Sequence, residues 1–345
     1  MNSSNNENNL NKNINVENIF PNIQFLSDLV KDSFAYLVQD NTFIIFKSIN
    51  DIFLTVYSNE KKSIIIFNLI DSKKVIEIKN AHNNYITNFR YFLDIINNRD
   101  LILSISAPDN SIKIWNINNF ECLLSIDKIY ENGILSSGIL LNNNNQNYLI
   151  VINFNVWESE PIKIYDFNGK KIKEINDNIN DKIFLIDICY DKKTSKNYFI
   201  TGNWGYVKSY DFNKNTLYKK YCDNDKSTHY NIIINPKEEI IKLIESGGDG
   251  NFRIWNFHSG LLLNKINTNK IGIRSICLWN NDYLFVGYYE ILKIINLKKG
   301  VIIKEINYPN YTMNNIKKIL HSKYGECLLS QGVKNEPIKL WIIKE

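Results

Sequence analysis

The sequence predicts an all-β fold, a seven-bladed β-propeller made of four-stranded antiparallel blades and closed by an N-terminal strand. Three observations lead to this prediction. Strand-length apolar runs alternate with turn residues, one strand pattern recurs at a regular spacing, and further apolar runs surround each recurrence. Four strands in a unit of about 40–50 residues are typical of one propeller blade. The predicted propeller covers residues 21–345.

The alternation of strands and turns is uniform along most of the chain. Runs rich in Ile, Val, Tyr and Phe are separated by clusters of Asn, Asp, Gly, Ser and Lys. The first group favours strands and the second favours turns. No long stretch keeps a 3.6-residue apolar period, so helix is expected to be minor. Residues 1–20 are Asn-rich, and we expect a disordered tail because they cannot bury enough apolar surface.

The recurring strand pattern is a turn, alternating apolar residues, an aromatic residue and then Asn or Asp, as in SIKIWNI (111–117). The aromatic position recurs with spacings of 48, 50, 45, 45, 40 and 46 residues. Seven members at this spacing predict seven blades. The positions, one of them aliphatic, are Phe67, Trp115, Tyr165, Tyr210, Trp255, Ile295 and Trp341.

The last unit lacks a fourth strand, because the sequence ends soon after its third. A closed ring then needs its final outer strand from the N-terminal region. Residues 34–39 are the expected supplier, with residues 23–26 as the alternative. Closure of this kind removes exposed sheet edges between the first and last blades.

Two units resemble the WD-repeat (Trp-Asp repeat) family. They are SISAPDNSIKIWNI (104–117) and SGGDGNFRIWNF (246–257), in which an Asp precedes the Trp by six positions. The resemblance implies a propeller whose blades contain a buried hydrogen-bond chain of Asp, His, Ser and Trp. The residues it implies are His82, Ser104 or Ser106, Asp109 and Trp115 in the second unit, and Ser246, Asp249 and Trp255 in the fifth.

Charge and motif content restrict the function. The net charge is +5, and the lysines are scattered rather than grouped as a nucleic-acid-binding surface would require. The five cysteines and four histidines show no metal-ligand spacing, so we expect no metal or other cofactor. No apolar run reaches the roughly 18 residues of a membrane helix, and no secretory signal is present. These features predict no membrane insertion and a cytoplasmic location, with the nucleus as the alternative.

The predicted function is that of a non-catalytic protein–protein interaction scaffold, or of an adaptor subunit of a larger intracellular assembly. Phosphate-binding loops and nucleophile elbows are absent from the sequence. The alternative is a propeller enzyme or small-ligand binder with a site in the central channel. Convergence of carboxylates or histidines in that channel would favour the alternative.

The candidate binding surface consists of aromatic residues in the turns between second and third strands. Gly, Asn and Asp suit such turns better, so large aromatics there suggest contact with a partner. Neighbouring glutamates would form an acidic rim, complementary to a basic and apolar segment of that partner. In the alternative interpretation the aromatics fold back over their own blades. The residues are Trp157, Glu158, Glu160, Trp204, Tyr288, Tyr289 and Glu290.

Overall fold

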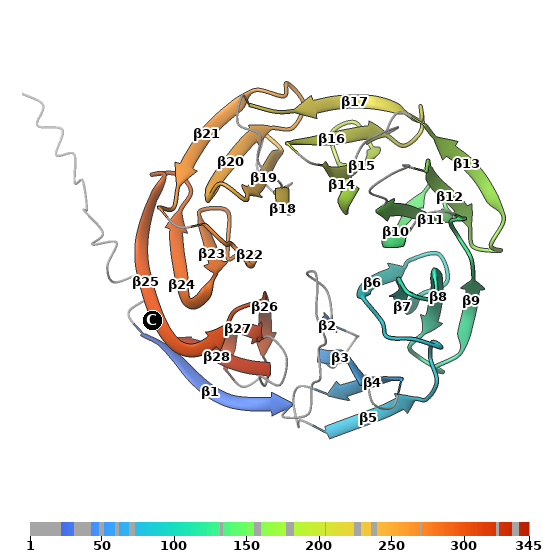
Figure 1. The fold of residues 1–345 in the computed structure, drawn as a ribbon, viewed down its shortest axis with the longest axis horizontal. Coiled ribbons are helices and arrows are strands. Elements are labelled where there is room, and N and C mark those ends of the chain that lie inside the picture. The colour runs from blue at the N-terminus through green and yellow to red at the C-terminus, as the bar shows by residue number, and fades with distance from the viewer. Residues whose placement is uncertain are drawn as a thin grey trace, which may run out of the picture.

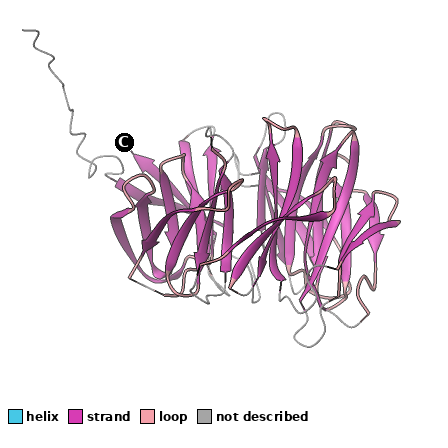
Figure 2. Cartoon of the chain, turned by 90° about the horizontal axis from the view of Figure 1, so that it is seen from above, coloured by secondary structure: helices cyan, strands magenta, loops and turns pink. Residues whose placement is uncertain are grey.

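The computed structural model describes residues 22–30, 43–47, 52–58, 62–68, 73–131, 134–154, 160–176, 183–203, 205–223, 229–235, 240–269, 271–321, 324–332 and 338–344. In this part of the chain all regular secondary structure is β-strand, and no helix is present. The strands form four-stranded antiparallel sheets that surround a central axis as the blades of a propeller (Figure 1). In the perpendicular view the strands run across the thickness of the molecule (Figure 2).

Each sheet is named here by its strands, given from the central axis outward. The β2–β5 blade contains Phe43–Lys47, Ile52–Ser58, Ser63–Asn68 and Lys73–Ile78. The β6–β9 blade contains Asn88–Asp94, Arg99–Ser106, Ser111–Asn116 and Cys122–Ile126. The β10–β13 blade contains Ile134–Asn143, Gln146–Phe154, Ile162–Asp166 and Lys171–Ile175. The β14–β17 blade contains Ile183–Asp191, Lys196–Asn203, Tyr206–Asp211 and Thr216–Tyr221.

The remaining sheets follow the same plan. The β18–β21 blade contains His229–Asn235, Lys242–Gly247, Asn251–Asn256 and Leu262–Asn267. The β22–β25 blade contains Ser275–Leu278, Tyr283–Gly287, Tyr289–Asn296 and Val301–Thr312. In the last sheet β26 (Asn315–His321), β27 (Gly325–Gln331) and β28 (Ile338–Lys344) are followed by β1 (Asn22–Val30) at the outer edge.

The strand that pairs with β28 is β1, which contains the alternative segment 23–26. Residues 34–39, the segment expected first, lie outside the described residues. The pairing is antiparallel and runs from Asn22 opposite Lys344 to Val30 opposite Ile338. An N-terminal strand and a C-terminal strand therefore share one sheet.

A β-bulge recurs beside the aromatic position of the third strand. In six blades the register between third and fourth strands shifts there by one residue, which leaves one outer-strand residue without an opposite partner. Bulges bend a strand and increase its twist, and they make an edge less able to pair with another chain. The bulged residues are all apolar or aromatic: Val75, Leu123, Ile172, Tyr218, Leu263 and Ile303.

The hydrophobic core lies between neighbouring blades. One cluster joins Leu103 and Ile114 of the β6–β9 blade to Leu149 and Val151 of the β10–β13 blade. Further clusters occupy the other interfaces between consecutive blades that the structure describes. The inner strands are buried on both faces for this reason, which explains their continuous apolar runs. No described helix is long and apolar enough to cross a membrane.

Candidate functional site

The predicted hydrogen-bond chain is present in the β6–β9 blade. Ser104 Oγ accepts a hydrogen bond of 2.8 Å from Trp115 Nε1 and lies 2.8 Å from His82 Nε2. All three residues are buried. Of the two candidate serines, Ser104 is therefore the member of the chain. Ser106 is also buried, but its hydroxyl has no hydrogen-bond partner among the described residues.

The role expected for Asp109 is wrong in one respect. The second ring nitrogen of His82, Nδ1, lies 3.0 Å from Ser111 Oγ rather than on the aspartate. Asp109 Oδ2 instead accepts a 2.8 Å hydrogen bond from the backbone N–H of Asn84, two residues after the histidine. The carboxylate thus fastens the loop that carries His82, because a half-exposed turn residue reaches the loop backbone more readily than the buried ring.

The His82 network is electrically neutral near pH 7. Burial, aided by the positive charge of Lys113 and opposed by Asp109, lowers the pKa of His82 to about 4. A neutral imidazole has one donor and one acceptor nitrogen, which suits two serine hydroxyls that can rotate to match.

A buried or half-buried lysine two residues before the aromatic position holds the incoming loop in three blades. Lys113 Nζ donates to Ala81 O at 2.8 Å, Lys163 Nζ to Ile129 O at 2.9 Å, and Lys293 Nζ to Thr268 O at 3.0 Å. Each acceptor lies in the connection from the preceding blade. The repeated I-K-I-W type pattern contains this cation, but its contact with the loop was not predicted from the sequence. The full set of cations is Lys113, Lys163, Lys208, Arg253, Lys293 and Lys339.

In the β18–β21 blade the expected network of Ser246, Asp249 and Trp255 does not form. Leu243 lies opposite Trp255, as Ile102 lies opposite Trp115. The residue at the place of Ser104 is therefore Glu245, and Ser246 falls one position further along. Trp255 Nε1 is buried and has no hydrogen-bond partner among the described residues.

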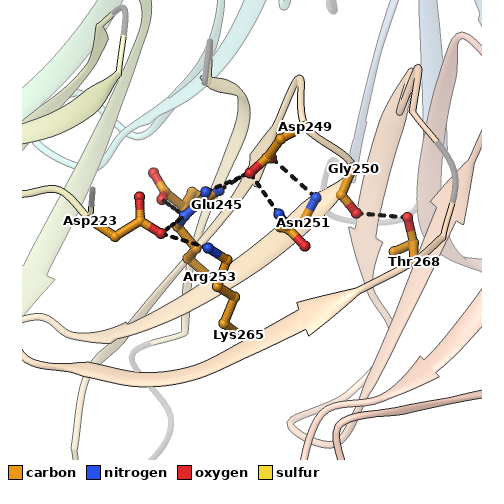
Figure 3. A network of polar contacts seen from close by, with 8 residues as sticks. All are labelled: Asp223, Glu245, Asp249, Gly250, Asn251, Arg253, Lys265 and Thr268. Carbon is orange, nitrogen blue, oxygen red and sulfur yellow. Dashed lines mark hydrogen bonds and ion pairs between the residues drawn. The ribbon is translucent and has the colours of Figure 1, made fainter. Parts of the chain in front are cut away.

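An ionic cluster around Arg253 replaces that network (Figure 3). The guanidinium is completely buried, with Nε 2.5 Å from Asp223 Oδ2 and Nη2 2.6 Å from Asp249 Oδ2. Glu245 Oε1 lies 3.8 Å from Nε, and Lys265 Nζ lies 3.1 Å from Asp223 Oδ2.

The charge of Asp249 is strongly favoured in this cluster. Burial alone would raise the pKa of Asp249, but hydrogen bonds from Arg253 and Asn251 outweigh it and lower the pKa to about 2. The turn also contacts the connection to the next blade, since Gly250 O accepts a 2.7 Å hydrogen bond from Thr268 Oγ1. The cluster therefore ties together three segments of the chain near one face of the propeller.

The sheet that contains β28 has a third variant of the network. Trp341 Nε1 donates to Ser330 Oγ at 2.7 Å, as in the β6–β9 blade. The hydroxyl of Tyr311 lies 3.0 Å from the same oxygen and takes the place of the histidine ring. A search for histidine alone could not find this unit, although Tyr311, at the end of β25, precedes β26 much as His82 precedes β6.

The predicted partner-binding residues have different outcomes. Trp157, Glu158 and Trp204 lie outside the described residues. Tyr289 is 57% exposed, as expected for a contact residue. Tyr288 is completely buried, so its expected exposure is wrong.

Backbone geometry explains the burial of Tyr288. Its N–H donates to Ile291 O at 2.9 Å and its C=O accepts from Met313 N at 3.1 Å, which turns the ring into the core. The two described glutamates have intramolecular contacts. Glu160 pairs with Lys163 at 3.0 Å, and Glu290 Oε1 accepts a 2.7 Å hydrogen bond from Asn310 N.

Exposed apolar side chains gather where the β22–β25 blade meets its incoming loop. Ile271 in that loop is 72% exposed, and Tyr289 is exposed in the turn. The loop is fixed to the blade because Arg274 N donates to Gly287 O at 2.8 Å. We call Ile271, Arg274, Tyr289 and Glu290 the turn patch. It offers an aromatic and an aliphatic side chain with one charge of each sign.

The channel side of the molecule contains a separate polar contact. Arg90 Nη2 on inner strand β6 donates to Ile186 O on inner strand β14 at 3.0 Å, past the intervening blade. Burial raises the pKa of the adjacent Asp187, although Arg90 and Lys317 lower it. Among the described residues no group of three or more His, Cys, Asp or Glu side chains could hold a metal ion.

The fold and this geometry define the class: the chain is a β-propeller protein. No protein-family model matches the sequence, and no curated protein matches it. Among solved structures the chain is similar to Raptor from Chaetomium thermophilum, with a TM-score of 0.68 and 13% sequence identity. The alignment covers 90% of this chain and 29% of that protein, so the chain spans less than a third of its length. At this identity the similarity shows the fold alone. With 1513 matching chains of solved structures, fold similarity does not single out a function.

Proposed function

We propose that this protein is a non-catalytic protein–protein interaction scaffold, or an adaptor subunit of a larger intracellular assembly in the cytoplasm or nucleus. The observation that carries the proposal is the exposed Tyr289 of the turn patch, which also contains the exposed Ile271. An exposed aromatic ring gains little from water, yet such rings anchor interfaces when a partner covers them. The propeller fold, shared with Raptor, is consistent with this function.

The charged and polar groups of the described blades support a structural rather than a catalytic assignment. The ring of His82 and the ammonium group of Lys113 are both bound to loops or hydroxyls within the protein. The Arg253 guanidinium is surrounded by carboxylates of its own chain. These groups hold the frame from which the exposed turns project.

The proposed partner presents an apolar segment with basic residues. Tyr289 and Ile271 would receive its apolar side chains, and Glu290 would attract its positive charge. The charge would affect the rate of association more than the affinity. Glu160 contributes less than the sequence suggests, because Lys163 neutralises it. Trp157, Glu158 and Trp204 remain proposed contact residues.

Affinity capture tests this proposal. The tagged full chain and its Tyr289→Ala/Ile271→Ser variant are used to capture partners from a lysate of cells that express the protein, and captured proteins are identified by mass spectrometry. A partner that the variant loses, with an unchanged melting temperature, supports the turn patch. Leu320→Ser, an exposed apolar residue on β26, is the matched control and should retain the partner. Equal capture by all three proteins would refute the turn patch.

We further propose that the propeller is a seven-bladed ring in residues 21–345, closed by β1. The antiparallel pairing of β1 with β28 supports this architecture. Removal of residues 1–20 should leave the melting temperature unchanged, because the tail is proposed to be disordered. Removal of residues 1–31 should lower it strongly, because the outer strand of one blade is lost. Equal melting temperatures for the two truncations would contradict closure by β1.

A further inference from the structure

The outer strand of the β18–β21 blade begins with exposed leucines. Leu261 is 66% exposed, Leu262 39% and Leu263 46%. In the described part of the chain no other three consecutive residues are large, apolar and exposed. The strand lies at the outer edge of its sheet, on the rim of the propeller (Figure 1). Exposed apolar groups that are contiguous, rather than scattered singly, indicate a contact surface.

Lysines lie near these leucines on the two neighbouring blades and on β21 itself. On one side lies β17, because Tyr218 OH contacts His258 Nδ1 at 3.0 Å and a Cβ at Gly260 would lie 3.7 Å from Lys219 Cδ. On the other side the turn at Gly300 packs on β21, since a Cβ there would lie 3.1 Å from Asn264 Nδ2. The exposed or half-buried lysines on these segments are Lys219, Lys220, Lys265 and Lys299.

The acidic groups near this rim are already neutralised. Asp223 is shared by Arg253 and Lys265, at 2.5 Å and 3.1 Å. Asp282, near the turn at Gly300, pairs with Lys298 at 2.9 Å. Lys265 and Lys298 are used in these ion pairs, so the positive charge beside the leucines comes from Lys219, Lys220 and Lys299. A second copy of this chain, with a net charge of +5, would bring like charge to it.

The first residues of β21 differ from the matching part of β13 in their flanking charges, since Leu263 and Ile172 are both bulged residues. In β13 the exposed Ile172 is flanked by Lys171 and Lys173, and charged side chains on an edge discourage pairing with another strand. Leu262 and Leu263 have only apolar and amide neighbours, Leu261 and Asn264. An edge without flanking charges can accept an additional strand through its backbone groups.

We propose that β21 binds an extended acidic segment of another protein as an additional strand of its blade. Aliphatic side chains of that segment contact Leu261, Leu262 and Leu263, and its carboxylates face Lys219 and Lys299. This surface is on the outer rim and is separate from the turn patch. Its failure in a test would therefore leave the proposed function of the turn patch unaffected, and the reverse also holds.

Defined peptides test the proposal with the full chain. The probe is a fluorescein-labelled peptide, SDLEIELDS, and its basic counterpart is SKLKIKLKS; binding is followed by fluorescence anisotropy. We expect the acidic peptide to bind at least about tenfold more tightly than the basic one. Its binding should weaken with added salt. Two further versions of the acidic peptide are N-methylated at alternate amides, so that each lacks the N–H groups of one edge. They distinguish backbone pairing with β21 from apolar contact alone. Only the version methylated on the edge that faces β21 should lose binding.

Variants locate the site. Leu262→Asp/Leu263→Asp should weaken binding of the acidic peptide by about tenfold or more, through lost apolar contact and charge repulsion. Lys219→Glu should weaken it less and mainly slow association. Ile172→Asp on β13 is the matched control, also a bulged and exposed residue, and should leave binding unchanged. Melting temperatures verify that each variant is folded.

Four outcomes would overturn the proposal. They are absence of binding by the acidic peptide, equal binding of both peptides, equal loss from both N-methylated versions, and no effect of the leucine substitutions. Sedimentation velocity adds a fifth. Self-association that Leu262→Asp abolishes would show that a second copy, rather than an acidic partner, occupies the strand.

Discussion

The β6–β9 blade and the β18–β21 blade hold their incoming loops by different interactions, mainly hydrogen bonds in the first and ion pairs in the second. Ser104 and Glu245 occupy the same place in the strand register, and so do Lys113 and Arg253. In the first blade a neutral hydroxyl joins Trp115 to a histidine, and the lysine binds a backbone carbonyl. In the second blade a buried carboxylate and a guanidinium replace both contacts.

The difference shows how a repeat tolerates substitution. What both blades share is the register and the attachment of the loop, while the attaching groups change between hydrogen bonds and ion pairs. The two ways of attaching the loop differ in how much stability a single substitution removes. A buried ionic cluster depends on every member, because removal of one leaves an uncompensated charge. A hydroxyl chain also suffers when one member is lost, but the groups left unpaired are neutral and cost less than a stranded charge.

Arg253→Met should have the largest effect. The substitution leaves Glu245, Asp249 and Asp223 close together without the guanidinium, and loss of one partner from a buried ion pair costs about 3–5 kcal/mol. Urea denaturation followed by tryptophan fluorescence measures the free energy of unfolding.

The matched control is Lys113→Met in the other blade. This substitution removes a hydrogen bond to a carbonyl but leaves no carboxylate without its partner, so a loss of about 1–2 kcal/mol in the free energy of unfolding is expected. The double variant Arg253→Met/Glu245→Leu should recover part of the loss. Equal effects of Arg253→Met and Lys113→Met would remove the distinction between the two blades.

Ser104→Ala should have the next largest effect. It removes the partner of Trp115 Nε1 and of His82 Nε2, and an unsatisfied buried donor costs about 1–3 kcal/mol. Ser106→Ala is the control, since that hydroxyl is buried without a described partner and its loss should be nearly neutral. If the two substitutions cost the same in thermal unfolding, the hydroxyl chain does not stabilise this blade.

The sequence was sufficient to predict the propeller and part of the network of one blade, the contact of His82 and Trp115 with a serine. The regular spacing of the third-strand aromatic, together with four apolar runs per unit, predicted the fold. The position of the hydroxyl was harder to infer. It is set across the strands, two residues beyond the residue that faces the tryptophan, whereas the motif counts along the chain.

A shift of one residue explains the error in the β18–β21 blade. Ser246 fits the motif by sequence, but Glu245 lies at the required register, and adjacent strand residues point to opposite faces. Tyr311 was missed because a tyrosine hydroxyl can take the place of a histidine ring nitrogen. Tyr288 was misjudged because turn position alone does not determine which way a ring points.

The two blades should also respond to acid in different pH ranges. The folded-state pKa of His82 is lowered from 6.5 to about 4 by burial. The unfolded chain then binds more protons, so stability falls as the pH drops from 6.5 to 4, by about 1 kcal/mol at pH 5.5. His82→Gln should reduce this slope. Stability from Asp249, whose folded pKa is about 2, is present above pH 4 and is lost only as the pH falls toward 2.

Thermal unfolding between pH 7 and pH 3 measures both ranges. Arg253→Met, which removes the cause of the low pKa of Asp249, should change the slope below pH 4 and leave the slope between 6.5 and 4 unchanged. A wild-type midpoint that stays constant from pH 6.5 to 4 would contradict a buried neutral His82.

The smallest effect is expected from the tryptophan ring nitrogens. Trp115→Phe and Trp255→Phe remove the same volume from similarly buried sites, so their packing losses should be comparable. Trp115 loses a 2.8 Å hydrogen bond as well, and Trp255 Nε1 has no described partner to lose. Trp115→Phe should therefore cost about 1 kcal/mol more than Trp255→Phe. In a Ser104→Ala background that difference should disappear, because the acceptor is already gone. A difference that persists there would assign the extra cost of Trp115→Phe to packing rather than to the hydroxyl chain.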